Sequence, residues 1–248
     1  MTEEGVEEAG ASLTGFMQLR DLKGRTFLDV GCGSGLFSLA AFRLKAERVV
    51  SFDQDPLAVE CCRQLRKESG NPFIWQVEDG SILDGRFLSK LGKFDVVYAW
   101  GVLHHTGNMW RAVANSARLV RVDGLLYMAL YNRVPGVLGS EFWLRVKRLY
   151  NSSSAIGQAT LEVLYLIAHF TISLGKDRSA TNESRRIGAR GMFWRTDITD
   201  WLGGYPYEFA SSIEVLEYMQ VNFPNFELTN VMQAKGLANN WYLFKRVY

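Results

Sequence analysis

The sequence predicts an α/β protein with a mostly parallel sheet of seven strands, of which the last two form an antiparallel hairpin. Three observations predict this class. From Arg25 onward, short apolar runs rich in β-branched or aromatic residues alternate with Gly or Asp turns and helical patterns, which is typical of βαβ units. The first such run enters a turn with three glycines. The last two runs are joined by a connection short enough for antiparallel pairing.

Length and composition fit one folded domain. The chain has 248 residues, of which 48% are hydrophobic and 22% charged, values typical of globular proteins rather than disordered or fibrous ones. A net charge of +2 does not indicate the concentrated basic surface of a nucleic-acid-binding protein. We therefore expect a single domain over residues 1–248, with residues 132–195 as a helical insertion.

The cysteines and the N-terminus indicate a reduced, cytoplasmic setting. Cys32, Cys61 and Cys62 are odd in number and form no C-x-x-C pair. Residues Met1–Leu13 carry four glutamates, where a signal peptide would have basic residues followed by an apolar run. We therefore do not expect secretion.

The first five strands are expected where apolar runs precede Gly or Asp turns. These runs are Thr26–Val30, Arg48–Phe52, Phe73–Val77, Phe94–Ala99 and Leu125–Tyr131. Helical patterns lie between them, near Leu36–Leu44, Pro56–Lys67 and Trp110–Leu119. Pro56 suits a first helical turn, where its missing N–H leaves no bond unmade.

The alternation stops after Tyr131. The segment Asn132–Arg195 has a helical pattern, strongest over Phe142–Tyr150 and Ile156–Leu174, and so predicts an insertion rather than another βα unit. The α/β pattern then returns. A helix is expected near Ser212–Asn222, followed by strands over Phe226–Met232 and Trp241–Arg246.

The strongest local signal is the glycine-rich segment Phe27–Phe37. A buried strand runs into a turn with glycines at the alternate positions Gly31, Gly33 and Gly35 and then into a helix, so that backbone N–H groups can approach a ligand without Cβ clashes. The dinucleotide fingerprint G-x-G-x-x-G is similar, but it requires Gly or Ala where this chain has Leu36.

Two acidic residues follow the next two strands. Asp53 ends the second strand, where a carboxylate can accept both hydroxyls of a ribose. Asp79 lies just past the third strand, where it can accept from an adenine amino group. Together they predict an adenosine-containing cofactor, without deciding between a nicotinamide dinucleotide and another adenosyl compound.

These segments together resemble the class I S-adenosylmethionine-dependent methyltransferases. The resemblance covers Thr26–Tyr131 and includes Phe94–His105, where a V-L-H-H sequence follows the fourth strand as in the broad group related to quinone-biosynthesis methyltransferases. It implies a Rossmann-like methyltransferase fold, S-adenosyl-L-methionine as cofactor and S-adenosyl-L-homocysteine as product. The segment Asp200–Glu208 is similar to an uncharacterised bacterial subgroup.

The resemblance also implies roles for individual residues. The three turn glycines would hold the methionine end of the cofactor, Asp53 the ribose and Asp79 the adenine, while Asp29 would support the turn or the amino group. The complete set expected at the cofactor is Asp29, Gly31, Gly33, Gly35, Asp53, Asp79, Gly80 and Trp100.

Methyl transfer from a sulfonium needs mainly orientation, and a base only where the acceptor starts protonated. The candidates for catalysis are His104 and His105, after the fourth strand, and Asn132, after the fifth. Helix capping or cofactor packing is the structural alternative for the histidines, and local backbone bonding is the alternative for Asn132. No cluster has metal-ligand spacing, so no metal is expected.

The insertion is expected to determine the acceptor. Residues 132–195 hold ten Lys/Arg against four Asp/Glu, and Trp143–Tyr150 has the pattern of an amphipathic basic helix, whose alternative is an ordinary solvated helix. The apolar segment Ala155–Leu174 contains Gln158, Glu162 and His169, and is expected as a buried lid or dimer helix rather than a membrane span.

The predicted function is methyl transfer to an O or N atom of a small-molecule acceptor of anionic or lipophilic character. Nucleic acid is disfavoured as a partner, while peripheral membrane contact and a homodimer stay open. Three alternatives stay open as well: an RNA or protein methyltransferase, a nicotinamide oxidoreductase, and a catalytically silent cofactor-binding or assembly module.

Overall fold

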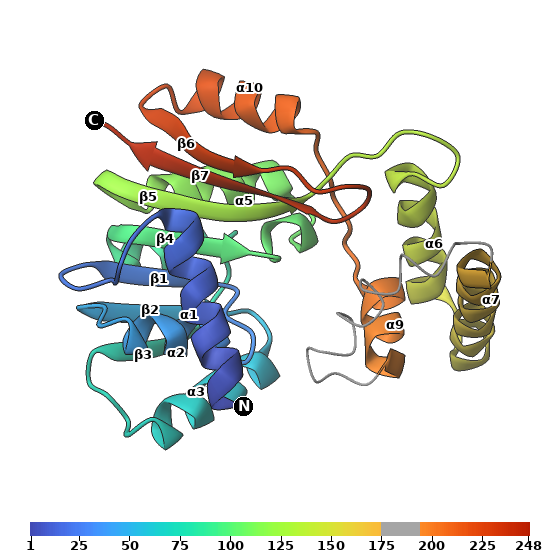
Figure 1. Ribbon diagram of the computed structural model, residues 1–248, viewed down its shortest axis with the longest axis horizontal. Coiled ribbons are helices and arrows are strands. Elements are labelled where there is room, and N and C mark those ends of the chain that lie inside the picture. Colours follow the sequence, from blue (N-terminus) through green and yellow to red (C-terminus); the bar gives the residue numbers. More distant parts are fainter. Residues whose placement is uncertain (175–193) are drawn as a thin grey trace. The chain divides into compact units, whose positions relative to one another are not determined.

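The computed structural model describes residues 1–174 and 194–248, which divide into two compact units. The first consists of Met1–Val134 and Phe209–Tyr248, and the second of Pro135–Glu208. Figure 1 shows that the strands belong to the first unit, whereas the second unit is helical.

A seven-stranded sheet with the order β3-β2-β1-β4-β5-β7-β6 forms the centre of the first unit. Its strands are β1 Thr26–Val30, β2 Arg48–Asp53, β3 Trp75–Asp79, β4 Phe94–Trp100, β5 Val120–Tyr131, β6 Phe226–Met232 and β7 Asn239–Arg246. The first five are parallel, and β7 lies antiparallel between β5 and β6 (Figure 1). The predicted fold, with its C-terminal antiparallel hairpin, is confirmed.

The register of the parallel strands brings their carboxyl ends to one edge of the sheet. Val30 pairs with Phe52 between β1 and β2, and Asp53 pairs with Asp79 between β2 and β3. Strand order reverses between β1 and β4, and ligands of open α/β sheets bind outside the carboxyl ends at such a point. The fold therefore places the glycine-rich turn after β1 where a ligand is expected.

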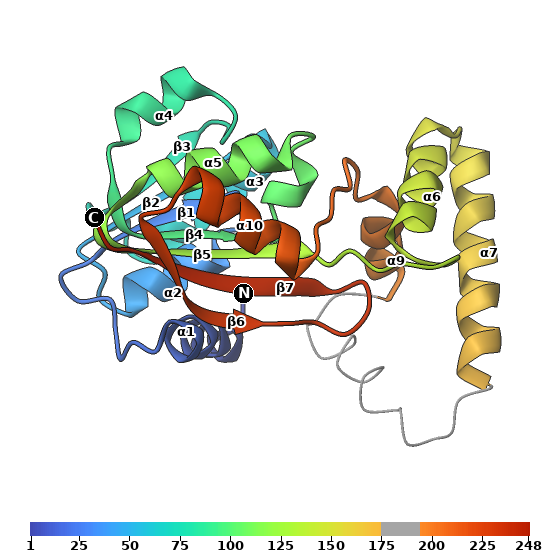
Figure 2. The same cartoon turned by 90° about the horizontal axis from the view of Figure 1, so that it is seen from above.

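Helices cover both faces of the sheet. They are α1 Glu3–Met17, α2 Leu36–Arg43, α3 Pro56–Glu68, α4 Gly85–Leu91, α5 Met109–Arg118 and α10 Ser212–Asn222. Buried side chains of α1, α2 and α3 share one apolar cluster with β1, and those of α4, α5 and α10 share another on the opposite face. Figure 2 shows α1 and α2 on one side of the sheet and α5 and α10 on the other.

Two helices of the first unit, α1 and α4, were not predicted from the sequence. The acidic N-terminal segment forms α1, with Thr2 as its N-cap and Leu13 fully buried. Glu3 accepts two hydrogen bonds from the Arg43 guanidinium, at 2.9 and 3.0 Å. The glutamates therefore lie on the outer side of an amphipathic helix whose apolar side covers the sheet.

The predicted start of the third strand at Phe73 is wrong. The strand begins at Trp75, because the Trp75 N–H donates to the Pro72 carbonyl at 3.2 Å and closes a turn there. The Phe73 side chain is 92% exposed on this turn. An aromatic residue beside a strand was mistaken for part of it.

The second unit contains α6 Ser140–Ser152, α7 Ala155–Leu174 and α9 Trp194–Gly203. The helical pattern predicted over Phe142–Tyr150 and Ile156–Leu174 is confirmed, whereas residues 175–193 of the predicted insertion and the side chain of His169 lie outside the described residues. Among the side chains of α7 that the structure describes, four large apolar ones are more than half exposed: Ile156, Val163, Leu164 and Ile167. Among the described residues, no helix has the length and apolarity needed to cross a bilayer.

Lys147 is the polar centre of the second unit. Its side chain is fully buried, its ammonium group donates to the Trp201 carbonyl, and its Nζ lies 4.1 Å from the centre of the Trp201 ring and 4.9 Å from that of Tyr207. Nearby, the Tyr150 hydroxyl donates to Glu162 at 2.6 Å. These contacts join α6 to α7 and α9.

We expect Lys147 to make the stability of the protein depend on pH. Burial lowers its pKa from 10.5 to about 8. Between these values the unfolded chain binds more protons than the folded chain, so stability rises with pH through this window. Relative to Lys147→Met, the wild-type protein should gain on the order of 2 kcal/mol of unfolding free energy as the pH rises across it. Urea titrations at several pH values, with the exposed Lys90→Met as control, measure this; equal pH profiles for wild type and Lys147→Met would refute it.

Candidate functional site

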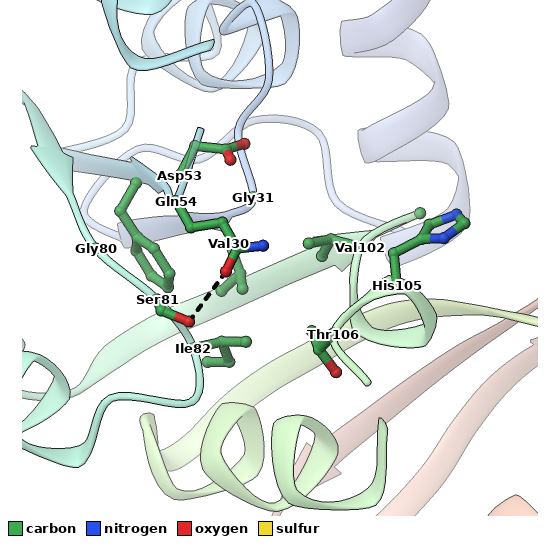
Figure 3. Close-up of a pocket in the computed structure, with 12 residues that line it drawn as sticks. Val30, Gly31, Asp53, Gln54, Gly80, Ser81, Ile82, Val102, His105 and Thr106 are labelled. Atoms are coloured by element: carbon green, nitrogen blue, oxygen red, sulfur yellow. Dashed lines mark hydrogen bonds between the residues drawn. The ribbon is translucent and has the colours of Figure 1, made fainter. Parts of the chain in front are cut away.

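A hollow of about 250 Å³ lies at the carboxyl ends of the central strands. It is lined by Val30, Gly31, Phe52, Asp53, Gln54, Gly80, Ser81, Ile82, Gly101, Val102, His105 and Thr106. Figure 3 shows Asp53 and Gly80 on one side of it and Val102 and His105 on the other. The loops after β1, β2, β3 and β4 therefore contribute to one site.

Glycine is required at the turn after β1 for two separate reasons. Gly31, Gly33 and Gly35 have φ values of +67°, +52° and +87°, at which a residue with a side chain is strained. A Cβ on Gly31 would lie 2.3 Å from Val102 Cγ2, whereas one on Gly33 would meet nothing within 4 Å. Gly31 is therefore a packing position, and Gly33 leaves open space for a ligand.

Asp53 fixes this turn from the neighbouring strand. Its Oδ2 accepts from the Gly33 N–H and its Oδ1 accepts from the Asp55 N–H, both at 3.0 Å. A carboxylate has about four acceptor positions, so each oxygen keeps one that can accept a further hydrogen bond. This arrangement suits a ligand with two adjacent hydroxyl groups.

The loop after β3 closes the same side of the hollow. The Gly80 N–H donates to the Asp53 carbonyl at 3.0 Å, and a Cβ on Gly80 would lie 2.4 Å from Cζ of Phe87. Asp79 is exposed beside it and does not line the hollow. The Ser81 hydroxyl donates to Gln54 Oε1 at 3.4 Å (Figure 3).

Four other predicted cofactor residues do not line the hollow: Gly33 and Gly35 in the turn, and Asp29 and Trp100. Asp29 is buried beneath the turn, where its Oδ2 accepts from the Ser38 hydroxyl at 2.5 Å; burial raises the pKa of its carboxyl to about 7. The ring centre of Trp100 lies 6.4 Å from that of Phe37 and 5.9 Å from that of Trp241. Their predicted contacts with a cofactor stay predictions.

The adjacent histidines have different surroundings. His104 is buried, and its Nδ1 accepts from the Tyr131 backbone N–H at 3.3 Å. Because Nδ1 is an acceptor in this bond, the neutral ring carries its proton on Nε2. His105 lines the hollow, with its ring centre 4.5 Å from that of His104. Of the two, His105 has the position of a base that faces a ligand.

Asn132 is held by the end of the hairpin. Its side-chain amide donates to the Gly236 carbonyl, and its side-chain oxygen accepts from Asn240, both at 3.1 Å. These bonds fit the structural alternative that the sequence left open. The catalytic role of Asn132 stays a prediction.

Sequence reasoning did not single out several lining residues. Gln54 and Val102 lie within segments that were recognised and Ile82 follows directly after one, but apolar and amide side chains carry no chemical signal of their own. Val102 had one indirect signal, its place beside the two histidines. Its contact with Gly31 requires the three-dimensional structure.

The fold and the glycine-rich site together define an α/β domain of the class I methyltransferase type. Residues 28–128 match the family model of a methyltransferase domain. Over residues 28–128 the chain therefore has a methyltransferase domain of the class I S-adenosylmethionine-dependent type, similar to the quinone-biosynthesis methyltransferases.

Curated relatives match about half of the chain. A ubiquinone biosynthesis O-methyltransferase from Xanthomonas oryzae pv. oryzae is 31% identical over 131 residues, which cover 51% of this chain and 53% of the relative. This chain thus spans about half the length of that relative.

Solved structures share the fold at low sequence identity. PKMT2 from Rickettsia typhi, in complex with AdoHcy, has a TM-score of 0.63 at 12% identity, with 95% of this chain and 52% of that one covered. Magnesium protoporphyrin IX methyltransferase from Synechocystis, with bound SAH, has a TM-score of 0.56 at 15% identity, with 98% and 82% covered.

Proposed function

We propose that this protein transfers the methyl group of S-adenosylmethionine to an oxygen or nitrogen atom of a small-molecule acceptor. One observation carries the proposal: a single hollow at the strand ends is lined by Gly31 and Asp53 on the cofactor side and by His105 on the other. The first two suit an adenosyl donor, and the third suits an acceptor that must lose a proton.

Different residues of the site bind the donor and remove the proton of the acceptor. Asp53 accepts the ribose hydroxyls, and the backbone around Gly33 lets the methionine part approach. Asp79 at the rim of the loop accepts from the adenine. The bound cofactor supplies an activated methyl group, so the protein contributes mainly alignment of the acceptor and removal of its proton by His105.

The acceptor is proposed to be a hydroxyl compound. The relative that is 31% identical over 131 residues is named a ubiquinone biosynthesis O-methyltransferase, which supports an oxygen acceptor. The second unit follows directly after β5 and lies outside the matched family model. We therefore assign acceptor selection to the second unit, in agreement with the role predicted for the insertion.

An assay with isotopically labelled donor tests the proposed function. Purified protein and methyl-deuterated S-adenosylmethionine are incubated with catechols and hydroxylated quinones, and in separate arms with total RNA and with a ribosomal protein extract. Labelled small-molecule ethers support the proposal. Labelling confined to RNA or protein would replace it with the macromolecular alternative. Cofactor binding without transfer to any arm would favour a silent module.

Substitution of His105 is expected to slow transfer without weakening donor binding. His105→Ala should lower kcat by about 100-fold with a hydroxyl acceptor, because general-base catalysis contributes roughly 10²–10⁴-fold. The loss should shrink as rising pH ionises the acceptor. Calorimetry with S-adenosylhomocysteine provides the control. A kcat equal to that of wild type would exclude His105 as the base.

A further inference from the structure

A chain of buried hydrogen bonds leads from the third strand to Asp29. The indole Nε1 of Trp75 on β3 donates to Ser51 Oγ on β2 at 2.8 Å, and Ser51 Oγ donates to Ser38 Oγ on α2 at 2.6 Å. Ser38 Oγ donates to Asp29 Oδ2 on β1 at 2.5 Å. Trp75, Ser51 and Ser38 are fully buried, so water does not compete for these bonds.

The indole at one end of this chain and an ionised Asp29 at the other fix the direction of its bonds. An indole N–H only donates, so Ser51 must accept from Trp75. The Ser51 hydroxyl has one proton, which it gives to Ser38, and the Ser38 proton is then given to Asp29. An ionised Asp29 only accepts, so in that state its Oδ2 receives the Ser38 proton and Ser38 in turn accepts from Ser51.

A donor at this oxygen opposes the other influences on Asp29. Burial, together with the negative charge of Asp53, raises the pKa of its carboxyl, whereas the hydrogen bond from Ser38 lowers it. The other titratable groups facing it are Cys32 in the turn and Tyr98 on β4, and Asp29 in turn raises the pKa of both. These two are neutral near pH 7, so Asp53 supplies the neighbouring charge.

We propose that Trp75, Ser51 and Ser38 are positioning residues that keep Asp29 able to ionise near neutral pH beneath the cofactor turn. An ionised Asp29 is a buried negative charge close to a site for a cofactor with a cationic sulfonium and a cationic amino group, to which it is attracted. The effect on cofactor affinity rests on the proposed function. The effect on the charge of Asp29 does not.

The test removes the first donor of the chain, far from the cofactor. Trp75→Phe keeps an aromatic ring in the core but leaves the Ser51 hydroxyl free to reorient, so that Asp29 no longer receives a fixed donor. Ser38→Ala removes the last donor directly, and it also serves if the tryptophan variant does not fold. Trp110→Phe is the matched control, because it removes an indole on the other face of the sheet.

Two readouts separate the proposal from a merely structural role. The first is the titration of the Asp29 side-chain carbon by NMR in the cofactor-free protein. Its midpoint should rise by roughly one pH unit in Ser38→Ala and by less in Trp75→Phe, with no change in Trp110→Phe. Unchanged midpoints in both variants would overturn the proposal.

The second readout is the affinity for S-adenosylhomocysteine, measured by calorimetry across pH. In Trp75→Phe and Ser38→Ala the affinity should fall several-fold near pH 7 and return toward wild type about one to two pH units higher, where Asp29 ionises without help. A loss that is the same at every pH contradicts the proposed link to the charge of Asp29. If the midpoints shift in the two variants but the wild-type protein binds no S-adenosylhomocysteine, the hydrogen-bond chain is upheld and the proposed function is refuted.

Discussion

Asp53→Ala is expected to weaken binding of S-adenosylhomocysteine by about 100-fold or more. The carboxylate accepts from the Gly33 and Asp55 N–H groups, and its remaining acceptor positions are proposed for the ribose. The substitution therefore releases the glycine turn and removes both acceptors of the ribose hydroxyls at once. Isothermal titration calorimetry measures the loss.

Asp55→Ala is the matched control for this variant. Asp55 lies two residues away and caps α3 by accepting from the Leu57 N–H at 3.0 Å, but it does not line the hollow. Its replacement should cost about 1 kcal/mol of stability and leave the affinity near that of wild type. Equal losses of affinity in both variants would show that the effect of Asp53 is not specific to the ribose.

Gly31→Ala is expected to destabilise the fold by roughly 3–5 kcal/mol, since it combines backbone strain with overpacking. The residue has a φ of +67°, and a Cβ there would lie 2.3 Å from Val102 Cγ2 and 2.7 Å from Val102 Cβ. Relief of this clash would move Val102, and with it the wall of the hollow. Urea-induced unfolding measures the loss of stability.

Gly33→Ala separates strain from packing within the same turn. Gly33 has a φ of +52° and open space around it, so alanine should cost only about 1–2 kcal/mol. Because that space is proposed for the cofactor, this variant should lose affinity out of proportion to its stability. If both variants lose the same stability, contact with Val102 is not what requires glycine at position 31.

The strands and most helices follow from the sequence because their signals are local. The predicted bounds of β1 and β6 match the structure, as apolar runs there end at a turn or a helix boundary. Helix α1 was missed because its few apolar residues are buried only through their contact with the sheet, which the local sequence does not show. The predicted strand start at Phe73 was wrong for a related reason. Only the hydrogen bond from the Trp75 N–H to the Pro72 carbonyl, which closes a turn, excludes Phe73 from the strand.

The site was predictable to the extent that backbone chemistry defines it. Glycines at alternate positions after one buried strand, followed by an acid at the end of the next, are in this order typical of an adenosyl-binding α/β site. The distinction between His104 and His105 was beyond the sequence, because it depends on a bond from the Tyr131 N–H. Likewise, the hydrogen-bond chain to Asp29 joins four elements and has no sequence signature.

The most direct test of the proposed cofactor site is a crystal structure of the protein grown with S-adenosylhomocysteine. We expect the nucleoside in the hollow, with its ribose hydroxyls against the Asp53 carboxylate and its amino-acid part beside the glycine turn. Density for the nucleoside at another place on the protein, with Asp53 free of it, would contradict this assignment.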